Sequence, residues 1–316
     1  MIRAVVARSV AFALFATLLA AVPAARAGNE KLTLPPEILQ AMETMHGGDP
    51  DTAIQMAHDF EQVHPEDALG YLLENEARWW KIYCGACEVK YGMVNPAKGK
   101  RREDESYFAL ADKAIHLAEA QIAKSETAEL HLYVGMGFAL KTQLYGLRGE
   151  NRNAAHAGVA ARTAFIRALQ LDPQMADAQV GLGLYNYYVD TLSSFVKVLR
   201  FFMGIPGGNK AEGLRQLETG MKDGVLMAVE ARFYLAKNLR TYDQQYERAA
   251  TIAEPLVSRY PRNPIFLLLL GNLNAELNRS SKASEYFRTA ASLPMPDSVC
   301  TGRVREIAKT FLASLP

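Results

Sequence analysis

Several features that mark common classes of protein are scarce in this chain. The 316 residues carry a net charge of only +1 and contain no long run of lysine and arginine. Nucleic-acid binding depends on a strong positive field, so no nucleic-acid partner is expected. Beyond residue 27, no apolar run reaches the roughly 20 residues that span a bilayer. Strand patterns are rare too, which disfavours β and α/β folds.

Motifs that carry catalysis are also missing. The sequence has no G-x-S-x-G elbow, no phosphate-binding loop and no H-E-x-x-H among its six histidines. The glycine pairs Gly135/Gly137 and Gly181/Gly183 lack the third glycine of a dinucleotide loop, and we interpret them as helix-contact positions. We therefore predict a protein that is not an enzyme and that binds no cofactor and no metal.

The N-terminus has the three parts of a secretory signal peptide. Arg3 and Arg8 form a positive region, residues 10–22 are apolar, and residues 25–27 read Ala-Arg-Ala. This pattern predicts cleavage after Ala27 and a periplasmic or secreted protein. An uncleaved membrane anchor is the alternative, although the apolar stretch is short for a bilayer span.

Apolar residues recur at spacings of three and four from residue 37 onward, and the breaks fall at glycine, proline and asparagine. This period is typical of amphipathic helices, and the short breaks favour antiparallel neighbours. Helices are predicted at 37–46, 51–64, 67–92, 103–124, 126–148, 152–171, 175–189, 192–203, 210–222, 227–240, 244–259, 264–278, 280–292 and 298–314.

A repeated pattern, A-x3-F-x2-A-x4-P, runs through these helices. Ala161, Phe165, Ala168 and Pro173 match every position. Partial matches are Ala53 with Pro65, Ala249 with Pro261, and Ala283, Phe287 with Ala290. The pattern is similar to the second helix of a tetratricopeptide repeat, in which small residues allow close helix contact.

Each helix pair of this kind exposes apolar surface that only a neighbouring pair can cover. We therefore predict an all-α fold, an α-α solenoid of five or six tetratricopeptide-like helix pairs over residues 28–316. Such stacks have a concave inner face, and this face is where we expect a protein or peptide partner to bind.

Residues 177–217 resemble a narrower group, the Iml2/tetratricopeptide-39 family and its exported bacterial relatives. The residues that carry the resemblance are Gly181, Gly183, Tyr185, Asn186, Gly208, Asn209, Lys210, Gly213 and Leu214. The likeness continues through residues 230–239 and 260–266. The chain departs from the eukaryotic members in its signal peptide and its shorter length. The resemblance implies a helical-repeat protein without catalytic activity.

A hydrophobic insertion is predicted at residues 190–210, within the repeat domain. Leu192, Phe195, Val196, Leu199, Phe202 and Met203 form one apolar helical stripe. The insertion either packs inside the solenoid, or contacts a membrane surface or a partner through this stripe. Asn209, with Glu212 three residues later, indicates that a new helix begins after it.

The sequence contains only three cysteines, and two of them stand close together at Cys84 and Cys87. In an exported protein, this spacing allows a small disulfide between them. Reduced core thiols, or a redox or metal role, remain alternatives. The thioredoxin-like setting of a redox pair and the four ligands of a zinc site are both absent from the sequence.

Aromatic residues cluster at Trp79 and Trp80 and at Tyr185, Tyr187 and Tyr188. Adjacent residues on a helix point about 100° apart, so at least one of each neighbouring pair is expected to face the groove or a helix edge. Exposed tyrosine and tryptophan are good anchors for a partner, whereas packing between repeats is the alternative. The sequence thus predicts an exported scaffold or adaptor. Peripheral membrane association through residues 192–205 and a redox carrier using Cys84 and Cys87 are the alternatives.

Overall fold

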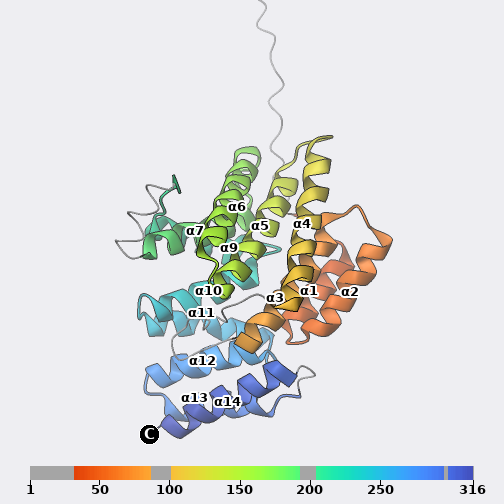
Figure 1. Cartoon of the computed structure of the whole chain (residues 1–316). Coiled ribbons are helices and arrows are strands. Elements are labelled where there is room, and N and C mark those ends of the chain that lie inside the picture. Colours follow the sequence, from red (N-terminus) through yellow and green to blue (C-terminus); the bar gives the residue numbers. More distant parts are fainter. Residues whose placement is uncertain (1–31, 87–100, 193–203, 295–297, 316) are drawn as a thin grey trace, which may run out of the picture.

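The computed structural model describes residues 32–86, 101–192, 204–294 and 298–315, and it contains only helices in these ranges (Figure 1). The predicted all-α class is therefore confirmed. The helices are α1 (Pro36–His46), α2 (Pro50–Val63), α3 (Ala68–Ala86), α4 (Arg102–Ile122), α5 (Ala128–Arg148), α6 (Asn151–Leu171), α7 (Ala176–Thr191), α9 (Lys210–Asp223), α10 (Ala228–Thr241), α11 (Tyr246–Arg259), α12 (Pro264–Glu276), α13 (Ser280–Ser292) and α14 (Ser298–Ser314).

Local signals set most helix boundaries where the sequence predicts them. The side chain of Asn209 accepts a hydrogen bond from the Glu212 amide at 3.0 Å, as expected for the start of α9. Asp49 and Asn263 cap α2 and α12 in the same way, each followed by a proline in the first turn. These caps satisfy amides that the helix itself leaves free.

Helices that follow one another along the chain pack side by side, so the described helices form six pairs with α14 at the end. The pairs are α1/α2, α3/α4, α5/α6, α7/α9, α10/α11 and α12/α13. The second helix of each pair buries a stripe of small residues. This repeating stack is the predicted α-α solenoid.

The repeat pattern in α6 has a direct packing reason. Phe165 is fully buried between two glycines, Gly135 on α5 and Gly181 on α7. A Cβ atom at Gly135 would lie 2.5 Å from the Phe165 ring, and one at Gly181 would overlap the ring. The glycines therefore act as helix-contact positions, as the sequence predicts.

Gly181→Ala is expected to lower the free energy of unfolding by about 1–3 kcal/mol, because the added methyl group overpacks the core against Phe165. Gly146→Ala is the matched control. Gly146 also lies within a helix, but no atom of the described residues stands within 4 Å of a Cβ added there. The free energy of unfolding of this variant is therefore expected to rise by up to about 1 kcal/mol. Urea unfolding of both variants measures the two opposite effects, and equal effects would contradict this account of the glycines.

Apart from α1, the first helices of the pairs form an inner layer that closes on itself through α14. Contacts run in order from α3 to α5, α7, α10, α12 and α14, and α14 returns to α3. In Figure 1, the orange and gold N-terminal helices accordingly lie beside the blue C-terminal ones. The solenoid is thus wound tightly enough for its two ends to meet.

An aromatic cluster fills part of the inside of this ring. The Trp80 ring lies 5.1 Å from Phe233 of α10 and 5.6 Å from Phe266 of α12, measured between centroids. Tyr83 packs edge-on against Phe233 at 5.7 Å. The predicted inner wall is therefore not free along its whole length, because the chain itself covers the part between α3, α10 and α12.

Polar contacts reinforce the meeting of the two ends. His46 Nε2 lies 2.7 Å from Glu230 Oε1, and both side chains are buried. Asn263 Nδ2 donates to the carbonyl of His46 at 2.9 Å, and Tyr260 Oη donates to Glu43 at 3.1 Å. Helix α1 is thus fixed to α10 and to the loop before α12.

Helices α4 and α5 share a buried ion pair. Arg148 Nε and Nη2 donate to Asp104 Oδ2 and Oδ1 at 2.8 and 2.7 Å, and both side chains are almost fully buried. Burial raises the pKa of Asp104, but the hydrogen bonds and charge of Arg148 together with the Arg101 amide hold it below its ordinary value. The carboxylate is therefore charged at neutral pH.

Candidate partner-binding site

Three tyrosines gather where the inner helices α7 and α10 meet. We call Tyr187, Tyr188 and Tyr242 the tyrosine cluster. The centroid distances are 5.8 Å between Tyr187 and Tyr188, 6.0 Å between Tyr187 and Tyr242, and 6.3 Å between Tyr188 and Tyr242. All three ring pairs meet edge to face, which is a favoured aromatic geometry.

The members of the cluster differ in exposure. Tyr187 is fully buried, Tyr188 is half-buried, and Tyr242 at the end of α10 is 39% exposed. The cluster thus has a fixed base inside the solenoid and an accessible edge. This is the arrangement that a binding anchor requires.

Hydrogen bonds hold the hydroxyl groups of two of the three tyrosines. Tyr188 Oη donates to Asn238 Oδ1 at 2.9 Å, and Tyr187 Oη donates to Asp243 Oδ2 at 2.9 Å. Asp243 also forms an ion pair with Lys210. Because the ring positions are set before a partner arrives, little side-chain freedom is lost on binding.

A buried lysine lies beneath the cluster. Lys237 Nζ stands 5.9 Å from the centroid of Tyr188 and 5.4 Å from that of Tyr234, and it donates to Tyr188 Oη at 3.4 Å. Burial lowers the pKa of Lys237 and raises the pKa of Tyr188. Among the described residues, no carboxylate forms an ion pair with Lys237. The cluster therefore suits apolar groups and hydrogen-bond acceptors better than cations.

Tyr185 belongs to a different side of α7. Its hydroxyl donates to the carbonyl of Pro206 at 2.8 Å, and the Arg162 guanidinium lies 5.5 Å from its ring centroid. The ring is half-buried. Tyr185 thus ties α7 to the segment before α9, and it is not part of the tyrosine cluster.

For the adjacent tryptophans of α3, the structure shows packing between repeats and not exposed anchors. Trp79 and Trp80 are each only 4% exposed. Trp79 Nε1 donates to Tyr234 Oη at 3.1 Å, while Trp80 belongs to the aromatic cluster inside the ring. Both are buried because α3 is contacted from several sides, by α1, α2, α4, α5 and α14. Trp79, Trp80 and Tyr187 are therefore core residues rather than exposed anchors.

The structure also corrects the cysteine pairing. Cys84 forms its disulfide with Cys300, 216 residues away in α14, and the Cα atoms are 5.1 Å apart. A bond to Cys87 would close only a small local loop, whereas closure of the inner ring brings Cys300 against α3. Cys87 itself lies outside the described residues, and Cys84 is buried.

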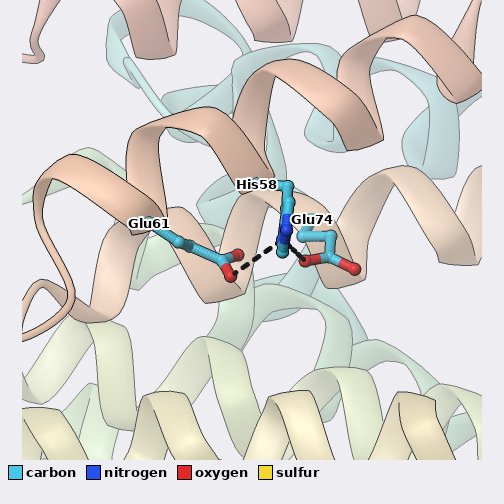
Figure 2. A group of neighbouring side chains, drawn as sticks. All are labelled: His58, Glu61 and Glu74. Atoms are coloured by element: carbon cyan, nitrogen blue, oxygen red, sulfur yellow. Dashed lines mark ion pairs between the residues drawn. The ribbon is translucent and has the colours of Figure 1, made fainter.

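A group of possible metal ligands lies between α2 and α3, where sequence reasoning found none. His58, Glu61 and Glu74 point toward one another in Figure 2, and their ligand atoms all lie within 4.8 Å. Burial, followed by the charge of Glu74, raises the pKa of Glu61 to about 8. The spacing of His58 and Glu61 on one helix face is visible in the sequence, but Glu74 comes from the next helix.

The comparison with known protein families concerns the C-terminal part of the chain. Residues 238–297, which include α11, α12 and α13, match the tetratricopeptide repeat family. Residues 238–297 are thus similar to tetratricopeptide repeats. The narrower resemblance to the Iml2/tetratricopeptide-39 family stays a prediction.

Two solved structures align over most of this chain. The C-terminal part of a TPR repeat-containing protein from Cytophaga hutchinsonii is 14% identical, over 88% of this chain and 87% of that chain, with a TM-score of 0.38. Yeast Tom70 is 10% identical over 88% of both chains, with a TM-score of 0.29. Scores this low carry no argument about function, so the assignment as a solenoid rests on the packing described above.

Two predicted segments of the repeat protein fall largely or wholly outside the described residues. These are the signal peptide at 1–27 and the hydrophobic insertion at 190–210, of which 193–203 are not described. Leu192, at the start of the insertion, is exposed. No described helix is long and apolar enough to cross a membrane. Peripheral membrane contact through residues 192–205 therefore stays a prediction.

Proposed function

We propose that this protein is an exported scaffold without enzymatic activity, and that it binds a segment of a partner protein at the tyrosine cluster. Tetratricopeptide repeats generally bind protein or peptide partners. The observation that carries the proposal is the exposure of the cluster: Tyr188 and Tyr242 are partly accessible to solvent, and Tyr187 beside them is fully buried.

The position of this site follows from the closure of the inner ring. Side chains of α3, α10 and α12 already fill the centre of the concave side, so a peptide cannot lie there without unfolding the core. The carboxyl end of α10 lies at the edge of this filled region and keeps Tyr242 exposed. The partner segment therefore docks at this rim, with an apolar side chain packed on Tyr188 and Tyr242.

Export is supported by two independent features. The first is the signal-peptide pattern of residues 1–27, and the second is the Cys84–Cys300 disulfide. Disulfides persist in oxidising compartments and are rare in the cytosol. A periplasmic or secreted protein accounts for both features.

A photo-crosslinking amino acid placed at position 242 tests the proposal in cells. We expect a discrete crosslinked product, whose partner is then identified and purified. Tyr242→Ala is expected to weaken binding of that partner by about tenfold or more, because the exposed ring is a principal anchor. Folding should be unchanged, since the backbone amide of Tyr242, and not its ring, caps α10.

The matched control is Tyr286, a half-buried tyrosine that lies on α13, away from the tyrosine cluster. A crosslinker at 286 should give no such product, and Tyr286→Ala should bind the purified partner as the unaltered protein does. Equal binding by Tyr242→Ala and the unaltered protein would rule out the tyrosine cluster as the site.

A further inference from the structure

The imidazole of His58 stands close to two carboxylates between α2 and α3, but too far for a hydrogen bond to either. His58 Nδ1 lies 3.8 Å from Glu61 Oε2 and 3.9 Å from Glu74 Oε2. Both separations exceed the length of an N–H···O hydrogen bond. Ligand atoms around a tetrahedral Zn²⁺ stand about 3.3 Å apart, given metal–ligand bonds of about 2.0–2.2 Å. The two distances from His58 are about half an ångström longer than this, and all three ligand atoms lie within 4.8 Å of one another.

One carboxylate oxygen at this place has no partner of its own. Glu61 is only 7% exposed, and within the described part of the chain its Oε1 atom accepts no hydrogen bond. Glu61 is buried because Gly70 on α3 leaves room for it, since a Cβ atom at Gly70 would lie 2.8 Å from Glu61 Cγ. A buried acceptor without a partner is unfavourable unless another group satisfies it.

Arg78 orients the carboxylate of Glu74 through the oxygen that does not face His58. Its Nε atom donates to Glu74 Oε1 at 2.7 Å, and its Nη2 atom forms an ion pair with the same oxygen at 2.5 Å. The other oxygen of Glu74, Oε2, is the one that faces His58. Arg78 thus fixes Glu74 much as an outer partner fixes a metal-ligating carboxylate. Metal ligation requires both glutamates to be ionised, and Glu61, Glu74 and Arg78 then leave one net negative charge.

We propose that His58, Glu61 and Glu74 bind a divalent transition-metal ion of the Zn²⁺ class. One imidazole nitrogen and two carboxylates favour such an ion over Mg²⁺ or Ca²⁺, which prefer oxygen ligands alone. His58 is about half-exposed, so the ion enters from solvent on that side and keeps one position for water. The bound ion joins α2 to α3 and stabilises the first two repeats.

Titration of the purified protein with ZnCl₂ and with MgCl₂ tests this site, by isothermal calorimetry and by thermal unfolding. We expect one equivalent of Zn²⁺ to bind and to raise the unfolding temperature, and we expect no such effect of Mg²⁺. His58→Ala and Glu61→Gln should each weaken Zn²⁺ binding by at least about tenfold, in the range reported for metal-site changes. Glu61→Gln keeps the shape of the side chain, and His58 is exposed, so at least one variant stays folded.

His116→Ala is the matched control. His116 also has a glutamate three residues later, with His116 Nδ1 3.9 Å from Glu119 Oε2. Both side chains are exposed, and no second carboxylate of the described residues joins them. This variant should bind Zn²⁺ as the unaltered protein does. Absence of binding at 100-fold excess of ZnCl₂ over protein, or equal binding by the folded His58→Ala variant, would overturn the proposal. Neither result would affect the partner site at the tyrosine cluster.

Discussion

Cys300→Ser is expected to destabilise the protein by about 2–5 kcal/mol, the usual range for loss of a native disulfide. The bond between Cys84 and Cys300 spans 216 residues, so its main effect is to restrict the unfolded chain over most of its length. In the folded state, the bond ties α3 to α14 and so joins the two ends of the inner ring. Thermal unfolding under oxidising conditions measures the loss.

The only two tryptophans of the chain report on the same place. Trp79 and Trp80 lie on α3 one turn before Cys84, and both are buried. If α14 separates from α3 in Cys300→Ser, the tryptophan emission should shift to longer wavelength before the helices melt. Far-ultraviolet circular dichroism follows the helices separately.

Cys87→Ser is the control that separates the two possible pairings. If Cys84 is bonded to Cys300, Cys87→Ser keeps the full stability and adding a reductant then lowers it. If the bond joined Cys84 to Cys87 instead, Cys87→Ser would be as unstable as Cys84→Ser, and Cys300→Ser would be close to neutral.

Asp104→Ala is expected to lower the free energy of unfolding by about 3–5 kcal/mol, because it leaves the Arg148 guanidinium buried without its carboxylate. Urea unfolding at neutral pH measures the change. Because the pKa of Asp104 is lower in the folded protein than its ordinary value of 3.8, the contribution of the pair is complete above that pH. It is lost as the pH falls further, through the lowered pKa.

Two controls show whether burial of the Asp104–Arg148 pair causes the loss of stability in Asp104→Ala. Glu247→Ala removes one half of an exposed pair, with Arg279, and should change stability by less than about 1 kcal/mol. The double variant Asp104→Leu/Arg148→Met replaces both charges with apolar groups and should recover most of the loss. A loss in the double variant as large as in Asp104→Ala would contradict this explanation.

The helices themselves could be predicted from the sequence, because a helix depends on residues three or four positions apart and on caps next to it. Most of the described helices begin and end within two residues of the prediction, as at α2 and α13. The sequence also predicted that Gly135 and Gly181 are helix-contact positions, since the repeat pattern requires small residues where helices touch.

The tertiary structure alone decided which residues from distant helices meet. Closure of the inner ring paired Cys84 with Cys300 and buried both Trp79 and Trp80, which no local spacing could indicate. The same holds for Glu74 beside His58 and Glu61, and for Tyr242 beside Tyr188. Helical period determines which face of a helix is apolar, but the curvature of the whole stack determines what that face contacts.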